Sequence, residues 1–178
     1  MSGQHTGRTD LPLLELGRTQ ATEVGLRVRD LVGPETAAVY SSPLRRALET
    51  AELILGPNDG VVVDDRLREF DYGDYEGLTT PQIHETRPGW TVFDGCPGGE
   101  SLADVESRVD MFLADVRARN TSTVVLFAHG HLLRILGARA IGQPGRAAIH
   151  LGLDTASVCV VSDLRDGPAI TLWNETAH

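Results

Sequence analysis

The sequence predicts a single α/β domain over residues 1–178, with helices packed against a mostly parallel sheet. Segments with apolar residues every three to four positions alternate with short valine-rich runs, which is the pattern of alternating helices and strands. The run 122–130 is almost continuously apolar, as expected of a parallel strand buried on both faces. No repeat, low-complexity tract or linker interrupts the chain, so we expect one core.

The first half of the chain predicts two helices and two strands. A helix is expected over 17–34, ending at Gly33-Pro34. A short strand over 37–42 leads into a helix over 43–57, and a second strand follows over 61–65. The apolar positions of the two helices are Ala21, Val24, Val28, Leu31, Leu44, Ala47, Leu48, Ala51 and Leu55.

The second half begins with a loop-rich segment, residues 66–99. A helix over 100–119 follows, with Ser101 as its expected N-cap. The buried strand leads into a helix over 131–142 that ends at a glycine. Two final strands, 157–164 and 169–174, are expected to form a hairpin around Asp166-Gly167.

Charge and composition narrow the classes of function. The net charge of −9 argues against nucleic-acid and anionic-membrane partners, and no apolar run is long enough to span a membrane. All 16 basic residues are arginine, which excludes lysine nucleophiles and the P-loop lysine. Cys96 and Cys159 form neither a disulfide framework nor a familiar metal site. We therefore expect a cytoplasmic protein with no metal and no cofactor.

Two predicted strand-to-helix junctions carry residues suited to phosphate. In such sheets, sites form where the carboxyl ends of strands meet helix N-termini. Arg45 and Arg46 lie in the first turn of the helix over 43–57. Positive side chains there oppose the helix dipole, and a bound phosphate would give them a reason to be there. The alternative is that one or both reach solvent.

The second junction is the His129-Gly130-His131 turn at the end of the buried strand. Gly130 allows a sharp turn into the helix, and an imidazole held there could face an anion. A single buried histidine is more often a core residue, but two at a strand-to-helix turn strengthen the functional interpretation. Glu69 and Glu76, between the two junctions, could supply a carboxyl group for proton transfer or could simply be solvated.

Other chemistries find little support. The chain has no G-x-S-x-G elbow, no G-x-G-x-x-G loop and no Walker motif. His129 and His131 lack the four-residue spacing of helical zinc ligands. Asp64 and Asp65 could hold Mg²⁺, but a solvated turn is the more common role of such a pair.

Five ordered blocks resemble the histidine phosphatase superfamily, which has the phosphoglycerate-mutase-like fold. They are "GQHTGRTDLPLLELGRTQA", "SSPLRRALETA", "LREFDYGDYEG", "GGES" and "VVLFAHGHLLR", and together they cover essentially the whole chain. The strongest likeness is to the acid-phosphatase and sugar-phosphatase branch. The resemblance implies a three-layer αβα sandwich and metal-independent phosphoryl transfer through a phosphohistidine.

The resemblance also implies roles for particular residues. Arg46 matches the arginine that clamps phosphate oxygens, and His129 matches a histidine that stabilises charge on the phosphoryl group. Glu69 matches the acid that protonates the leaving oxygen, a role for which a raised pKa is expected. The expected substrate-binding residues are Thr6, Gly7, Arg8, Tyr72, Gly130 and His131. Arg8 could meet a second phosphate or could equally be solvated.

The family's nucleophilic histidine lies in an Arg-His-Gly motif at the end of a first, central strand. This sequence contains neither that strand nor that motif. The loop that follows the motif in the family is matched by Thr6, Gly7, Asp10 and Leu13. His5 is therefore not expected to be the nucleophile, and Leu14 stands where the family often has a capping threonine. Either the start codon is assigned too late, which we favour, or the chain is an inactive relative or a phosphate-ester-binding module.

Within the family, a phosphatase is favoured over a phosphoglycerate mutase. The familiar mutases carry a longer and more basic insertion, whereas residues 78–98 contain Arg87 as their one basic residue. A small cap would leave a phosphoenzyme open to water. We expect a small phosphate ester as the binding partner. The sequence is compatible with a monomer and with a homodimer.

Overall fold

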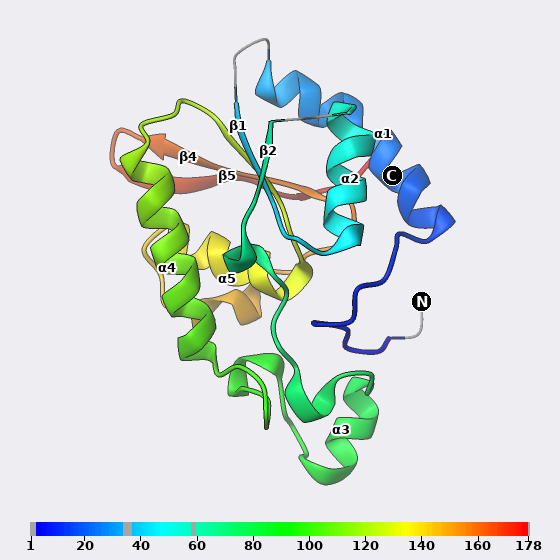
Figure 1. The fold of residues 1–178 in the computed structure, drawn as a ribbon. Helices are drawn as coiled ribbons and strands as arrows, with labels where there is room; N and C mark the ends of the chain where they lie inside the picture. The colour runs from blue at the N-terminus through cyan, green and yellow to red at the C-terminus, as the bar shows by residue number, and fades with distance from the viewer. Residues whose placement is uncertain (1–2, 34–36, 58–59, 178) are drawn as a thin grey trace.

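Three parallel strands, β1 (Ala38–Ser41), β2 (Val61–Val63) and β3 (Val124–Phe127), form the centre of the fold in the order β2-β1-β3 (Figure 1). The computed structural model describes residues 3–33, 37–57 and 60–177. The register places Ser41 beside Phe127, so the carboxyl ends of β1 and β3 share one edge. That edge is where the two predicted junctions meet.

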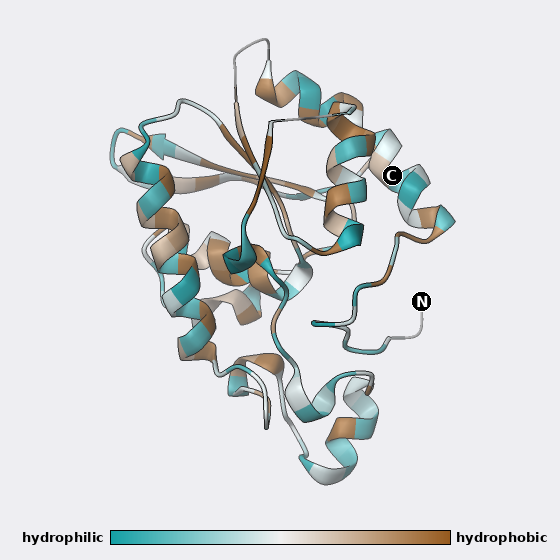
Figure 2. Ribbon diagram, in the orientation of Figure 1, coloured by the Kyte–Doolittle hydropathy of each residue, from teal (hydrophilic) through white to brown (hydrophobic). Residues whose placement is uncertain are grey.

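Helices cover both faces of this sheet, as the three-layer prediction requires. α1 (Glu15–Val32) and α2 (Arg45–Leu55) pack together on one face, and α4 (Leu102–Ala118) and α5 (Gly130–Ala140) on the other. Because side chains alternate along a strand, Phe127 of β3 joins the α1–α2 core while Leu126 packs against the α4–α5 core. Hydrophobic residues accordingly concentrate on the strands, and the helices carry stripes of both kinds (Figure 2).

The last two strands form a separate antiparallel sheet. β4 (Val158–Leu164) and β5 (Gly167–Glu175) pair as a hairpin, which confirms that expectation. The turn lies at Arg165-Asp166, one residue earlier than expected, because Gly167 already pairs with Leu164. The main sheet is parallel as predicted, but the hairpin is not part of it. Within the described residues β3 pairs with β1 alone, so its other edge has no partner strand.

The loop-rich segment contains more structure than the sequence predicted. A short helix, α3 (Thr80–Thr86), begins with a capping box between Thr79 and Gln82, a signal that the sequence analysis missed. Short 3₁₀ helices occur at Asp65–Leu67, Gly73–Tyr75, Val92–Asp94 and Gly145–His150. α3 and its flanking turns form a small cap at one end of the molecule (Figure 1).

The helix ends follow the sequence closely. Ser101 caps α4 by accepting a hydrogen bond from the Asp104 N–H, as predicted. Gly33 ends α1 with a φ of +65°, and Pro34 lies outside the described residues. Leu14 stands at the N-cap of α1 without a side-chain cap. Among the described residues, no helix has the length and apolar character needed to cross a membrane.

Candidate active site

The carboxyl edge of the parallel sheet brings the two predicted junctions together. Ser42 follows β1 and its N–H donates to the Phe127 carbonyl at 2.9 Å, which fixes the chain beside the end of β3. His129 follows β3 as the N-cap of α5 and is 6% exposed. Its Nε2 lies 2.8 Å from Ser42 Oγ. The imidazole is therefore held by backbone and by a buried hydroxyl.

Arg46 reaches this imidazole from the first turn of α2. Its Nε donates to His129 Nδ1 at 3.2 Å, so the ring proton is assigned to Nε2, which faces Ser42. The two terminal nitrogens of Arg46 donate to the carbonyls of Thr9 and Thr6 at 3.0 and 3.1 Å. All three acceptors are neutral, and no described carboxylate forms an ion pair with Arg46. The guanidinium thus keeps its charge available to an anion.

His129 is neutral near pH 7 in this arrangement. Burial lowers its pKa, Glu69 raises it and Arg46 lowers it further, and the result is a pKa of about 4. A neutral imidazole beside a half-buried arginine offers N–H donors and positive charge in a site of low dielectric. This is the environment in which a dianion would raise the histidine pKa and be stabilised in return.

Glu69 is buried at the N-terminus of α5 rather than solvated. One carboxylate oxygen accepts from the backbone N–H groups of Phe70 and Leu132 at 2.9 and 3.0 Å, and the other from His131 at 3.1 Å. Burial alone would raise its pKa, but His131, His129 and the backbone donors hold it below the ordinary value. The expectation of a raised pKa is wrong for the contacts that this structure shows.

Tyr72 and His131 lie against the cap. Tyr72 Oη is 2.7 Å from His131 Nδ1, and burial raises the pKa of this phenol. The His5 ring packs 4.8 Å from Tyr72 and 5.5 Å from Trp90 between ring centroids, and its Nε2 is 3.1 Å from Thr80 Oγ1. Burial lowers the pKa of His5, and the charge of His131 lowers it further. His5 thus packs under the cap and makes no hydrogen bond to Arg46 or His129.

The N-terminal loop contacts Arg46 through its backbone carbonyls. Thr6 offers its carbonyl to Arg46. A Cβ added to Gly7 would lie 2.0 Å from the Phe70 carbonyl oxygen, so only glycine fits there. The Gly7 N–H donates to Glu76 at 3.0 Å, and Thr9 donates to the same carboxylate from N and Oγ1 at 2.9 and 2.7 Å. Glu76 therefore fixes the loop and is fully used as a hydrogen-bond acceptor.

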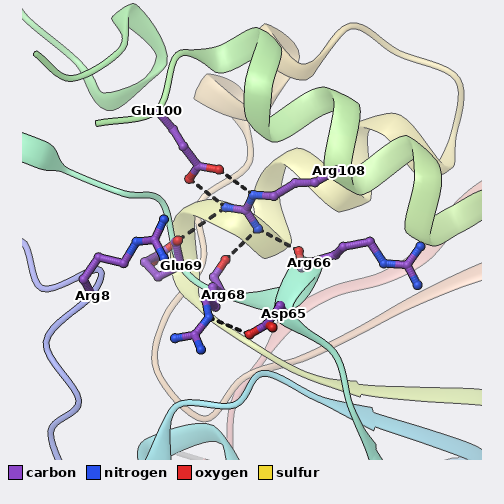
Figure 3. A pocket seen from close by; sticks show the side chains of 7 residues that line it. All are labelled: Arg8, Asp65, Arg66, Arg68, Glu69, Glu100 and Arg108. Carbon is purple, nitrogen blue, oxygen red and sulfur yellow. Dashed lines mark hydrogen bonds and ion pairs between the residues drawn. The ribbon is translucent and has the colours of Figure 1, made fainter. Parts of the chain in front are cut away.

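Two predicted substrate residues lie on the periphery. Arg8 forms an ion pair with Asp71 at 2.9 Å and faces a pocket that Glu69 also lines (Figure 3). Gly130 opens α5, is exposed, and has open space where a Cβ would be. Gly130 thus leaves room beside His129.

Several contributors were missed by the sequence analysis. In the sequence, Ser42 stands only as the end of a predicted strand, and Thr9 belongs to no distinctive pattern. Arg108 holds the segment before Glu69, because it pairs with both oxygens of Glu100 at 2.7 and 3.0 Å and donates to the carbonyls of residues 66, 68 and 69. The "GGES" block included Glu100, but no spacing in the sequence linked it to α4.

The alternative magnesium site is not supported. The Asp64 carboxylate caps the turn Asp65–Leu67 and binds Arg66 through both oxygens. That pairing lowers the pKa of Asp64 and uses the oxygens that a cation would need. No group of three potential metal ligands occurs among the residues that the structure describes.

Fold and site together define a class: an α/β protein in which an arginine and a histidine meet at the carboxyl edge of a parallel sheet. The chain belongs to the histidine phosphatase superfamily (branch 1), whose family model matches residues 1–176. The resemblance seen in the five sequence blocks is thus confirmed.

Individual relatives agree with this assignment. The chain is 41% identical to an acid phosphatase of Mycobacterium tuberculosis over 88% of this chain and 76% of that protein. It is 35% identical to sedoheptulose 1,7-bisphosphatase of Saccharomyces cerevisiae, covering 77% of this chain and 61% of the yeast protein. The solved structure of the Mycobacterium tuberculosis open reading frame Rv3214 superposes with a TM-score of 0.92 and 36% identity, over 99% of this chain and 91% of that one.

Proposed function

We propose that this chain forms the phosphoryl-binding core of a phosphatase that hydrolyses small phosphomonoesters. The observation that carries the proposal is the contact between Arg46 Nε and His129 Nδ1 at the carboxyl edge of the sheet. Charge on a transferring phosphoryl group is spread over its oxygens, and preorganised N–H donors stabilise it without reorganisation. Arg46 would hold two of these oxygens in place of the Thr6 and Thr9 carbonyls, and His129 a third.

The proposed reaction passes through a phosphohistidine and needs no metal. An imidazole nitrogen bonds to phosphorus while the ester P–O bond breaks, and the leaving oxygen takes up a proton. Water then attacks the phosphohistidine and releases inorganic phosphate, which returns the imidazole. The nucleophile is the histidine of the family's Arg-His-Gly motif, which the 178 residues do not contain. The residues present bind and stabilise the phosphoryl group.

Glu69 is proposed as the source of the leaving-group proton. The lowered pKa of Glu69 would by itself make this carboxyl group a poor acid. A phosphoryl dianion bound at Arg46 and His129 brings negative charge close to it and raises that pKa. The carboxyl group would therefore take up its proton when the substrate binds.

The relatives favour hydrolysis of sugar phosphates and related esters over a mutase reaction. Their names include sedoheptulose 1,7-bisphosphatase and glucosyl-3-phosphoglycerate phosphatase, although a probable phosphoglycerate mutase is also similar. In the cap, Arg87 donates to the carbonyls of Gly95 and Asp94 rather than facing a second phosphate. We propose a cytoplasmic enzyme.

The test compares p-nitrophenyl phosphate hydrolysis by this chain with that of a chain extended by an apolar strand ending in Arg-His-Gly, both with a chelator. We expect negligible turnover by the 178 residues and metal-independent turnover by the extended chain. Arg46→Gln and His129→Gln should each lower the rate of the extended chain by about 10²–10³-fold. An extended chain that folds and binds phosphate but hydrolyses nothing would favour the alternative, a phosphate-ester-binding module. Robust turnover by the unextended chain would require another nucleophile, and His5 would be examined first.

A further inference from the structure

A pocket of about 530 Å³ beside the candidate site is lined by four arginines and three carboxylates. The carboxylates are Asp65, Glu69 and Glu100, and the arginines are Arg8, Arg66, Arg68 and Arg108. Figure 3 shows that the lining comes from the N-terminal segment, the segment after β2, the loop before α4 and α4 itself. The four arginines differ in how far their N–H groups are already used.

Arg108 and Arg66 are occupied. Arg108 donates from Nε and both terminal nitrogens to Glu100 and to three backbone carbonyls. Arg66 donates from the same three nitrogens to Asp64 and Asp115, and its side chain points away from Arg8 and Arg68 (Figure 3). These two arginines therefore build the wall of the pocket rather than offer a binding group.

Arg8 and Arg68 are the available cations. Each uses its Nε in one ion pair, Arg8 with Asp71 and Arg68 with Asp65, at 2.9 and 2.8 Å. The terminal nitrogens of both have no protein partner among the described residues. Asp65 is 80% exposed at its side chain, and ion pairs of this kind contribute little in water. Both guanidinium groups can thus present a fork of N–H donors to a ligand.

The pocket adjoins the proposed phosphoryl site, because Arg8 and Arg68 are close in the chain to residues of that site. Arg8 lies in the loop whose Thr6 and Thr9 carbonyls contact Arg46. Arg68 directly precedes Glu69, whose carboxylate accepts from the N-terminus of α5 next to His129. A molecule with its phosphoryl group at Arg46 and His129 could therefore extend past Glu69 into the pocket.

We propose that Arg8 and Arg68 form a subsite for a second anionic group, a phosphate or a carboxylate, on the leaving-group side of the substrate. The preferred substrates are then phosphomonoesters that carry a second negative group. The planar guanidinium fork matches both anions and holds them in a defined direction. This inference rests on the proposed function, since it assumes that the first phosphate lies at Arg46 and His129.

The test is a binding series on the 178-residue chain with matched six-carbon ligands. Fructose 6-phosphate has one anionic group, 6-phosphogluconate adds a carboxylate, and fructose 1,6-bisphosphate adds a phosphate. Calorimetric Kd values are measured for each ligand and for inorganic phosphate, in the natural chain and in Arg8→Gln, Arg68→Gln and the double variant. Inorganic phosphate is also measured with Arg46→Gln, which tests the phosphoryl site itself. Arg119→Gln, which removes an exposed arginine outside the pocket, is the matched control.

The natural chain should bind a doubly anionic ligand at least tenfold more tightly than fructose 6-phosphate. Each single substitution should reduce that preference by about tenfold, since a charge-assisted hydrogen bond is lost. Affinity for inorganic phosphate should stay within about twofold, and Arg119→Gln should change neither value. Which of the two doubly anionic ligands binds more tightly identifies the group that the subsite takes.

The outcomes separate the two proposals. Equal affinity for all three sugar phosphates, with phosphate binding that depends on Arg46, overturns the subsite and leaves the proposed function standing. A preference that survives in the double variant also overturns the subsite. If no ligand binds, including inorganic phosphate, the phosphoryl site and the subsite both fail.

Discussion

At the scale of single residues, the chemistry depends on which groups are buried without a counter-charge. Arg46 has three neutral acceptors, and His129 is held neutral by burial. The sequence identified both residues and their junctions. It could not reveal that the Glu69 carboxylate accepts hydrogen bonds from three backbone N–H groups. Two of these donors, His131 and Leu132, lie 62 and 63 positions further along the chain, and no local pattern links them to Glu69.

The buried neutral His129 makes stability depend on pH. Its folded pKa of about 4 lies below the ordinary 6.5, so between these values the unfolded chain binds more protons. The contribution of neutral His129 to the free energy of unfolding is complete above pH 6.5. As the pH falls, this contribution decreases, by roughly 2 kcal/mol at pH 5. Urea unfolding at pH 7 and pH 5 measures this loss. His129→Gln should make the pH dependence shallower, and an unchanged pH dependence would contradict the assigned burial.

The proton-donor role of Glu69 predicts a selective defect. In the extended chain, Glu69→Gln should lower kcat/KM for an alkyl phosphate far more than for p-nitrophenyl phosphate, whose leaving group barely needs a proton. The ratio of the two losses is unaffected by any unfolded fraction of the variant. Equal losses on both esters would leave Glu69 with the structural task of anchoring α5.

At the scale of elements, the N-terminal loop and the cap position the arginine. Glu76 receives three hydrogen bonds from Gly7 and Thr9, and the carbonyls of that loop hold Arg46. The sequence suggested a proton-transfer role for Glu76. Its contacts instead make it a positioning residue, and its pKa is low because the Thr9 and Gly7 donors outweigh the effect of burial.

Loosening this loop should weaken phosphate binding without unfolding the chain. Glu76→Gln turns an amide NH₂ toward one of the N–H donors, so we expect a loss of about three- to tenfold in phosphate affinity. Amide hydrogen exchange at Gly7 and Thr9 should accelerate in the same variant. The exposed Glu85→Gln is the matched control. Unaltered exchange and affinity in Glu76→Gln would remove Glu76 from the positioning network.

The start of α1 offers a test of local structure that is independent of the site. Leu14 occupies the N-cap, is 65% exposed and makes no capping hydrogen bond. Leu14→Thr should stabilise the protein by about 0.5–1 kcal/mol, because a hydroxyl can accept from a free N–H of the first turn. Chemical denaturation measures the gain, with the exposed Leu26→Thr inside the helix expected to destabilise slightly. A loss of stability in Leu14→Thr would show that the leucine packs against something.

At the scale of the whole molecule, periodicity predicted every described strand, the hairpin and all the described α-helices except α3. It could not predict that β4 and β5 stand apart from the parallel sheet, since strand pairing is a property of chain topology rather than of composition. α3 was missed because its apolar pattern is too short, although its capping box is visible in the sequence. The Arg108–Glu100 support was missed because long-range ion pairs leave no local pattern.

The central claim is that Arg46 and His129 bind the phosphoryl group, and histidine NMR of the 178-residue chain with inorganic phosphate tests it most directly. Saturating phosphate should raise the His129 pKa from about 4, because a bound dianion favours the imidazolium, and Arg46→Gln should abolish this rise. If phosphate leaves the His129 titration unchanged, or shifts it equally in Arg46→Gln, then Arg46 and His129 do not bind the phosphoryl group together.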